Sequence, residues 1–476
     1  MVKKEKIFLF QENNKRNLRA TKLIFVNISV DHYLSIFAAM REKSAFIIGC
    51  IAMRCAVSKI AQGKQLTLEY NMGPLVNSTI VELGSTIAGP FCGRLLADFG
   101  AEVLKVEPPT GDPVRSMGKH KVAENGEDVS LYAASILRNK KLIAVDMRTT
   151  RGQQVIRDLV RISDVVIENF RPGGLEKWRL GYEDLKAVKP DLVMARISGF
   201  GQFGPYAPRP GFGIIGEAVS GMRHITGDPD RPPARVAVSL TDYITGLYAA
   251  FGISMALIHR DRTGEGQVVD ANLMESAFSF MEPHISAFDQ LGYVANRSGS
   301  RLPGVAPNGL FKTRDGRDLQ IAASGTPVFR RLCRVMGREE WVTDSRFATG
   351  RARGQNQEVL EQMVQDWVGR HDLLFLEAEL AAADVPATRI FTMADVFRDP
   401  HYAARETVAR VAHPALGLLA MAAPAPRLSQ SPGEIRWPGR AIGADTREIL
   451  MQKAGYDEEQ VRSLIADGTI SVAAPD

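Results

Sequence analysis

The feature that most constrains the fold is a regular alternation of short apolar runs and amphipathic segments between residues 79 and 198. The run TIVEL (79–83) is followed by a turn, by the helix-like FCGRLLADFG (91–100) and by the β-branched run AEVLKVE (101–107). A strand, a helix and a strand within about 30 residues form a βαβ unit. Strands joined by such a crossover pair in parallel.

The alternation continues along the chain to residue 198. In chain order, the expected elements are a strand LIAVDM (142–147), a helix (150–163) and a strand DVVIENF (164–170). The segment YEDLKAVKP (182–190) then leads into DLVMARIS (191–198), which reads as a further strand. Repeated β-α-β-α patterning predicts an α/β fold with an open, mainly parallel sheet that carries helices on both faces.

A second unit is expected after residue 290, where turn-forming residues accumulate in NRSGSRLPGVAPNG (296–309). Two runs that flank Asp315-Gly316 predict a hairpin, and two helical patterns follow at 357–370 and 372–385. We therefore predict a large α/β domain over 77–290 and a smaller α+β domain over 291–394. Residues 395–476 mix helices with Pro-rich connections and could pack on either domain.

The net charge of +5 comes from the first 76 residues. They hold 12 Lys or Arg and 5 Asp or Glu, so the remaining 400 residues carry a net charge of −2. A body with no basic excess does not favour nucleic acid as a partner. The apolar run AFIIGCIAM (45–53) is far shorter than the roughly 20 residues of a bilayer span, so no membrane partner is expected either.

We interpret residues 1–76 as an accessory extension, poorly ordered or wrongly assigned to the protein, with the folded part starting near Met72. A basic transit peptide is the alternative. The four cysteines show neither metal-ligand spacing nor a disulfide framework, which favours a reducing cytoplasm and predicts no metal site.

A GxGxxG pattern, Gly199 to Gly204, follows the strand predicted at 191–198. A dinucleotide-binding turn needs a helix to begin at its third glycine, since free N–H groups at that helix end hold the pyrophosphate. Here PYAPRPG (205–211) follows, and proline removes those donors. We therefore reject a dinucleotide site and expect a loop at a ligand-binding sheet edge.

Several segments together resemble one known family. They are VELGSTIAGPFCGRLLADFGAEVLKVEPPTGDPVR, RNKKLIAVDM, VIENFRPGGLEKWRLGYEDL, ISGFGQFGPYAPRPGFG, VSLTDYITGLYAAFGISMALIHRDRTGEGQVVDANLMES and RDPHYAAR. In this order they resemble the class III CoA-transferases, also called the CaiB/BaiF family, from about residue 77 to the end. The resemblance implies a Rossmann-like large domain to which 395–476 returns, and a homodimer of two interlocked subunits.

The resemblance also implies transfer of CoA from an acyl-CoA to a carboxylic acid, with Asp242 as the nucleophile. The aspartate would pass through a mixed anhydride and an aspartyl-CoA thioester. From the residues alone, Asp242 is first of all an N-cap of the apolar helix that it opens. The two roles are compatible, because a helix N-terminus favours the ionised carboxylate that attacks a thioester. Gly246 and Gly252 would let another backbone pack closely on that helix.

CoA is expected as a co-substrate, with no tightly bound cofactor. The resemblance places it along two predicted strand ends, at Val145, Asp146, Met147 and Arg148 and at Asn169, Phe170, Arg171 and Lys177. We take these ends to belong to adjacent strands. Each step develops an oxyanion, which requires backbone N–H donors. Ile87-Ala88 and the turn 302–305 are our candidates to supply or cover them.

Four departures from the family pattern bear on the substrate. Racemases of the family need a histidine within a stretch that matches Gly211-Phe212-Gly213, and phenylalanine cannot carry a proton. Gly213 stands where many transferases have a larger or acidic residue, which puts the shape of the acyl pocket in doubt. Ile87, in place of a glutamine, and the glycine-poor LPGVAPNG (302–309) argue against formyl-CoA or oxalate. A racemase and a CoA-binding protein without catalysis remain as alternatives.

Overall fold

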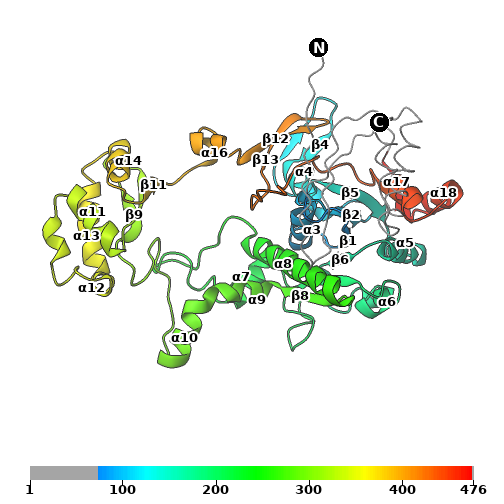
Figure 1. Cartoon of the computed structure of the whole chain (residues 1–476), viewed down its shortest axis with the longest axis horizontal. Helices are drawn as coiled ribbons and strands as arrows, with labels where there is room; N and C mark the ends of the chain where they lie inside the picture. The colour runs from blue at the N-terminus through cyan, green and yellow to red at the C-terminus, as the bar shows by residue number, and fades with distance from the viewer. Residues whose placement is uncertain (1–72, 474–476) are drawn as a thin grey trace, which may run out of the picture. The chain divides into compact units, whose positions relative to one another are not determined.

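The structure is a computed structural model in which residues 73–473 are described (Figure 1). The expectation for residues 1–76 lies almost wholly outside this range. The described residues belong to one unit, Asn71–Asp476.

A seven-stranded sheet forms the centre of the larger part of this unit, in the order β14-β5-β2-β1-β6-β7-β8. Its strands are β1 (Thr79–Glu82), β2 (Glu102–Glu107), β5 (Lys140–Val145), β6 (Val165–Glu168), β7 (Val193–Ser198), β8 (Val268–Asn272) and β14 (Ile470–Ser471). All neighbours pair in parallel except β14, which is antiparallel to β5. The predicted α/β fold with a mostly parallel sheet is confirmed.

Helices cover both faces of this sheet because the strands are apolar on both faces. One hydrophobic cluster joins the sheet to α5 (Thr150–Arg161), α17 (Thr446–Gln452) and α18 (Glu458–Ala466). The other joins it to α3 (Ala88–Asp98) and α8 (Leu240–Thr263). A shorter helix, α6 (Tyr182–Lys186), precedes β7.

The strand order corrects one expectation. β5 and β6 follow each other along the chain but are separated in the sheet by β2 and β1. The chain winds outward from β1 to β5, then returns past β1 to continue with β6, so the order reverses between β1 and β6. Ligands of open α/β sheets bind at the carboxyl edge near such a reversal. The two predicted CoA-binding strand ends are therefore three strand spacings apart, about 14 Å.

The remaining elements of this part are short. They are η1 (Pro113–Ser116), β3 (His120–Val122), β4 (Asp128–Ser130), α4 (Leu131–Ile136), η2 (Glu176–Trp178), α7 (Gly213–Val219), α9 (Leu273–Phe278), η3 (Ser279–Met281) and α10 (Glu282–Leu291). Residues 199–212 contain no helix, and Gly204 has a positive φ of 93°, so the GxGxxG stretch is the loop that the prolines predict.

The chain from residue 306 to 385 forms its own hydrophobic cluster. The predicted hairpin is present as β9 (Asn308–Lys312) and β10 (Asp318–Ala322), with β11 (Ala387–Arg389) at its edge. Helices accompany it: α11 (Thr326–Val335), η4 (Glu339–Val342), α12 (Gly350–Gln355), α13 (Gln357–Val368) and α14 (Leu373–Ala382). This part of the chain thus contains both helices and a small sheet, and its assignment as a separate domain over 291–394 stays a prediction.

The end of the chain contacts the large sheet. After α15 (Met393–Val396), α16 (Pro400–Ala404) and the hairpin β12 (Val408–His413)–β13 (Gly417–Ala422), it runs past the start of β5. There Asn139 Oδ1 accepts the backbone N–H of Arg436 at 2.7 Å. The chain then adds α17, α18 and β14 to the sheet edge.

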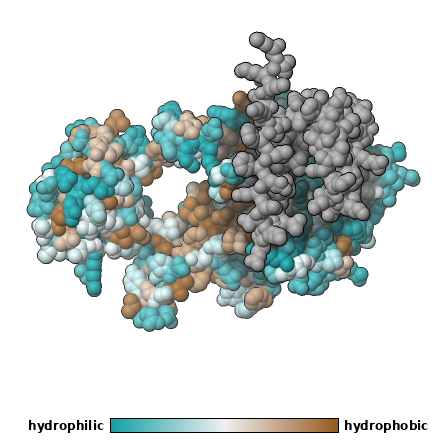
Figure 2. All heavy atoms as spheres, viewed as in Figure 1, coloured by the Kyte–Doolittle hydropathy of each residue, from teal (hydrophilic) through white to brown (hydrophobic). Residues whose placement is uncertain are grey.

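The apolar sequence of the long helix α8 predicts that it is largely buried, but in the structure the helix is only half covered. Leu247, Phe251, Met255 and Ile258 are exposed along one side, and Phe251 is 60% exposed. Figure 2 shows apolar side chains gathered near α7 and α8. Within the described residues, α8 alone is long and apolar enough to pass for a membrane span, although the core helix of a soluble protein has the same properties.

Candidate active site

Asp242 lies in the first turn of α8, as the third residue of the helix. Ser239 is the N-cap, so the prediction that Asp242 caps the helix is wrong. The exposed stretch 232–238 leads into α8. The helix therefore begins three residues before the position predicted from Asp242. The carboxylate is therefore not committed to an N-cap bond and is left for other contacts.

Burial raises the pKa of Asp242 to about 6, and the nearby charge of the Arg235 guanidinium opposes this rise. The helix N-terminus was expected to keep the acid strong, but desolvation outweighs it. A carboxyl group of this acidity is still about nine-tenths ionised at pH 7. It is also a stronger base, and so a better nucleophile, than an exposed aspartate.

Gly213, the first residue of α7, packs directly on this carboxylate. A Cβ placed on Gly213 would lie 2.0 Å from Asp242 Oδ2 and 3.1 Å from Thr241 Oγ1. The Thr241 hydroxyl donates to the Gly213 carbonyl at 2.6 Å, which fixes the start of α7 against the start of α8. The Asp242 carboxylate can therefore occupy this position only because residue 213 is a glycine.

Gly246 brings the same turn of α8 against the amino end of α3. A Cβ on Gly246 would lie 2.8 Å from the Ala88 carbonyl oxygen and 2.9 Å from the Phe91 ring. Asp242 lies four residues before Gly246 and thus on the same side of α8. Ile87 is the N-cap of α3, without a side-chain cap bond, and Ile87 and Ala88 are both buried. The expectation that Gly246 permits close backbone packing is confirmed.

Gly252 also allows a close contact, but with a side chain. A Cβ there would lie 2.5 Å from Val269 Cγ1 on β8.

Two tyrosines next to this site were missed by the sequence reasoning. The hydroxyls of Tyr132, on α4, and Tyr243 are 2.8 Å apart, and the Tyr243 ring meets Phe91 edge-on at 4.6 Å. Burial, the Tyr243 hydrogen bond and the charge of Asp242 raise the pKa of Tyr132. Nothing in the sequence pairs positions 132 and 243, which are 111 residues apart.

The residues predicted at the end of β5 lie at the carboxyl edge of the sheet. Val145 is fully buried and pairs with β14, and Met147 packs on the core. Asp146 accepts two bonds from the Arg148 side chain, at 2.8 Å each, and this lowers the pKa of Asp146. Arg148 itself projects outward with its side chain 76% exposed.

The residues predicted after β6 lie nearer the β1–β6 reversal. The Asn169 amide accepts from the Ser85 N–H and donates to the Ser85 carbonyl, both at 2.8 Å, which joins β6 to the β1–α3 turn. Phe170 packs edge-on against Trp178 at 5.6 Å. Arg171 and Lys177 are exposed.

The turn 302–305 belongs to the α+β part of the chain. The Gly304 N–H donates to Gln357 Oε1 at 3.0 Å, and the Gln357 amide donates to the Leu302 carbonyl at 3.3 Å. Its contacts thus tie it to α13, and its expected role over the acyl group stays a prediction.

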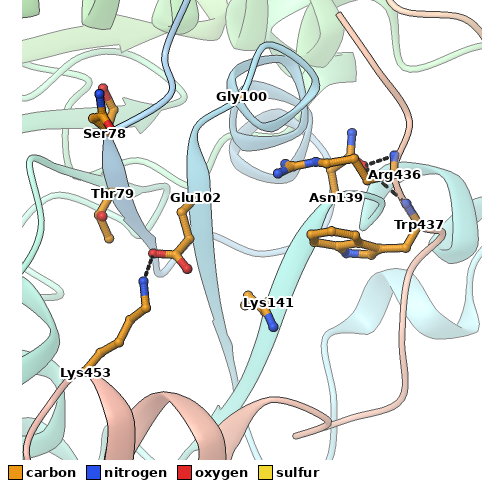
Figure 3. A pocket seen from close by; sticks show the side chains of 10 residues that line it. Ser78, Thr79, Gly100, Glu102, Asn139, Lys141, Arg436, Trp437 and Lys453 are labelled. Carbon is orange, nitrogen blue, oxygen red and sulfur yellow. Dashed lines mark hydrogen bonds and ion pairs between the residues drawn. The ribbon is translucent and has the colours of Figure 1, made fainter. Parts of the chain in front are cut away.

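A cavity of about 320 Å³ lies at the opposite, amino end of the sheet (Figure 3). Lys453 there points to Glu102, and the Lys141 ammonium is 3.2 Å from Asp445. The starts of β1, β2 and β5 form its wall, so it is separate from Asp242. Across residues 73–473, no group of three or more His, Cys, Asp or Glu side chains is placed to hold a metal ion.

Comparisons with known proteins agree on one family. Residues 75–446 match the model of CoA-transferase family III. The chain is 44% identical over 398 residues to succinyl-CoA–D-citramalate CoA-transferase of Chloroflexus aurantiacus, which covers 83% of this chain and 98% of that protein. It is 35% identical to mouse succinyl-CoA:glutarate CoA-transferase, over 84% and 91% of the two chains. A solved CaiB/BaiF family protein from Brucella suis superposes with a TM-score of 0.71 at 35% identity, over 80% and 99%.

Proposed function

Because this chain belongs to CoA-transferase family III, and is a CoA-transferase as its relatives are, we propose that it moves CoA from succinyl-CoA to a second dicarboxylic acid with Asp242 as the nucleophile. The relatives named above act on succinyl-CoA with citramalate or glutarate as partner acids. The observation that carries the proposal is the position of Asp242, in the first turn of α8 beside Gly213. It lies on the same side of the helix as Gly246, which packs on the amino end of α3.

The chemistry needs no external base, because each nucleophile is already an anion. An Asp242 oxygen attacks the donor thioester carbonyl, and the C–S bond breaks to release CoA thiolate and leave a mixed anhydride. The thiolate then attacks the aspartyl carbonyl, which releases the donor carboxylate and leaves an aspartyl-CoA thioester. The acceptor carboxylate repeats the two steps in reverse order, so Asp242 is regenerated with no net proton change.

Each attack places negative charge on a carbonyl oxygen, which backbone N–H groups stabilise when they are fixed in advance. The first turn of α3 supplies such donors at Ile87, Ala88 and Gly89, while Pro90 has no N–H. The N-cap side chain of this helix is an isoleucine that cannot accept a bond, so these donors keep their capacity for a substrate oxygen.

We place CoA along the carboxyl edge of the sheet. Arg171 and Lys177 after β6, and Arg148 after β5, put three cations along about 14 Å of that edge, which suits a cofactor whose phosphates are spread along an extended chain. Arg148 is oriented by Asp146 and stays exposed. Met147 and Phe170 would form the apolar floor, and the fully buried Val145 would support it from within β5. Asn169 would act through the β1–α3 turn, whose Ser85 backbone it binds.

The functional molecule is proposed to be a homodimer. The exposed side of α8 continues into exposed aromatic residues of the elements that follow, Phe278, Phe280 and Phe288. An apolar surface of this extent marks a protein interface. A second copy of the chain fits it best, because interlocked subunits would cover α8 from outside.

The experiment is an exchange assay with a trapping step. The protein is incubated with succinyl-CoA and a panel of mono- and dicarboxylic acids, and new thioesters are measured by liquid chromatography. We expect exchange with dicarboxylic acids, and hydroxylamine is expected to convert Asp242 to a hydroxamate found by peptide mass spectrometry. Incorporation of solvent deuterium at the α-carbon without CoA exchange would favour the racemase. The absence of both CoA exchange and deuterium incorporation would favour a binding protein without catalysis.

A further inference from the structure

The turn between β1 and α3 holds an unfavourable backbone conformation next to the proposed site. Thr86 has φ = 68°, in the left-handed region. A β-branched residue is a genuine outlier there and persists only where its surroundings fix it. Thr86 directly precedes Ile87, the N-cap of α3, so the strained residue determines where the helix begins.

Four side chains from separate parts of the chain bind the backbone of this turn and of the helix start that follows it. The Lys105 ammonium donates to the Gly84 carbonyl, and the Asn169 amide holds Ser85 at both its N–H and its carbonyl. Asp112 Oδ1 accepts the Thr86 N–H at 3.0 Å. Lys140 Nζ donates to the Pro90 carbonyl at 2.7 Å, within the first turn of the helix. The backbone is thus bound at three consecutive residues of the turn, Gly84, Ser85 and Thr86, and again at Pro90.

Three of these side chains, Lys105, Asp112 and Lys140, form one buried ion network together with Glu82. Lys140 Nζ lies 2.7 Å from Glu82 Oε2, and Lys105 Nζ lies 2.7 Å from Asp112 Oδ2. Lys105 also approaches Glu82, at 3.5 Å, which links the two pairs. All four residues are at most 2% exposed.

The stability of the fold alone does not explain such a buried ion network. Replacing a buried ion pair by apolar groups of similar volume is often neutral or stabilising, because removing two charges from water costs so much. The network also requires a glycine in helix α3, because a Cβ on Gly93 would lie 1.8 Å from Glu82 Oε2. The network therefore calls for an explanation other than the stability of the fold.

We propose that Lys105 and Lys140 are positioning residues, which the network holds so that the strained β1–α3 turn keeps the N–H groups of Ile87, Ala88 and Gly89 directed at the acyl oxygen on Asp242. This inference rests on the proposed function for its catalytic consequence. The two lysines act on the β1–α3 turn. Lys105 binds Gly84, the first residue of the turn, and Lys140 binds Pro90 in the first turn of α3. Neither lysine acts on the substrate itself.

The main test is a charge-balanced double variant, Glu82→Gln with Lys140→Met. It removes one cation and one anion together, so no unpaired buried charge remains and the fold is expected to keep its thermal midpoint. The donor to the Pro90 carbonyl is lost, and we expect kcat to fall on the order of 10- to 100-fold with little change in KM for the acyl-CoA, as when an oxyanion donor is misplaced.

The matched control lies at the other end of the same helix. Arg138 and Asp98 form a buried pair at 2.6 Å, with both side chains 1% exposed. Arg138→Met with Asp98→Asn removes a comparable pair, and we expect kcat to stay within about twofold of the wild type. An equal loss in both double variants would show that α3 needs buried charges only for its packing, and would overturn the proposal.

A second variant tests the turn without touching any charge. Thr86→Gly relieves the backbone at φ = 68° and is expected to leave stability equal or higher, while kcat falls because the turn gains freedom. Glu406→Gly is its control, since Glu406 has φ = 49° in an exposed position after α16, and it should leave kcat unchanged.

Hydrogen exchange separates this proposal from the proposed function. Amide exchange in the peptide 84–91 should be faster in the Glu82→Gln/Lys140→Met variant than in the wild type, whatever chemistry Asp242 performs. If that exchange rate is unchanged, the network does not position the turn and the inference fails. If it rises while the wild type forms no adduct on Asp242, the network positions the turn but the assignment of the nucleophile fails.

Discussion

Gly213 and Asp242 are in contact in a way that leaves no room for a side chain at position 213, since a Cβ there would lie 2.0 Å from Asp242 Oδ2. The two residues are 29 positions apart and begin two different helices, α7 and α8. The start of α7 thus forms one wall around the carboxylate, and the amino end of α3 lies on the side of α8 that Gly246 marks.

Gly213→Ala is expected to displace the Asp242 carboxylate and to reduce kcat at least tenfold, because an overlap of this size forces a side chain or a backbone segment to move. The destabilisation should be about 1–3 kcal/mol. Steady-state kinetics and thermal unfolding measure the two effects. Gly325→Ala is the control, since a Cβ at that position meets nothing within 4 Å; wild-type kcat in Gly213→Ala would contradict the assignment.

The rate should depend on pH through Asp242. Since burial raises the pKa of this carboxyl group to about 6, kcat/KM for the acyl-CoA should fall about tenfold per pH unit below pH 6 and level off above pH 7. A profile measured between pH 4.5 and 8 checks this. A rate that stays constant down to pH 4.5 would mean that the nucleophile is a more acidic group.

The same pKa shift makes a prediction for stability. The folded chain holds the Asp242 proton more tightly than the unfolded chain, so this group makes stability fall as the pH rises from about 4 to 6. Above pH 6 the ionised carboxylate costs about 1–3 kcal/mol. Asp242→Asn should therefore raise the thermal midpoint at pH 7.5, lose this advantage below pH 4 and abolish exchange. A variant that is less stable at pH 7.5 would argue that the carboxylate has a structural role.

Substitutions at two glycines of α8 distinguish an effect on helix packing from an effect on catalysis. Gly246→Ala and Gly252→Ala each insert a methyl group, the first against the Ala88 backbone and the second against the Val269 side chain. Both should destabilise the protein, with the larger loss at Gly246 because backbone atoms yield less than a side chain. Only Gly246→Ala should lower kcat, since it moves Asp242 relative to α3. Equal kcat values in the two variants would disprove this coupling.

The exposed side of α8 tests the proposed dimer. Phe251→Asp places a charge in the middle of the apolar surface formed by Leu247, Phe251, Met255 and Ile258. We expect the wild type to be a dimer by analytical ultracentrifugation and the variant to be a monomer or an aggregate. Arg351→Asp, on exposed α12 outside this surface, should stay dimeric. A monomeric wild type would contradict the proposal.

Much of the fold follows from local pattern. The expected strands at 79–83, 142–147, 164–170 and 191–198 are present within a few residues, because parallel strands buried on both faces leave a clear apolar signal. The prolines after Gly204 excluded a helix there for a local reason as well. The hairpin around Asp315-Gly316 formed as its turn residues require.

What the sequence did not predict depends on distant contacts. The reversal of strand order between β1 and β6 is a property of the whole sheet. The local pattern therefore predicts that the ends of β5 and β6 are adjacent, whereas β2 and β1 separate them. The N-cap at Ser239 could not be distinguished from Asp242 by residue type, since both are good caps. The pairing of Tyr132 with Tyr243, and the fit of Gly213 to Asp242, appear only when separate elements meet.

The most direct test of the account is mass spectrometry of the Asp242 peptide after the protein is mixed with succinyl-CoA and quenched within one turnover. The account predicts a CoA or succinyl adduct on Asp242, removed by hydroxylamine and absent from Asp242→Asn. An adduct on another residue, or full exchange activity in Asp242→Asn, would contradict it.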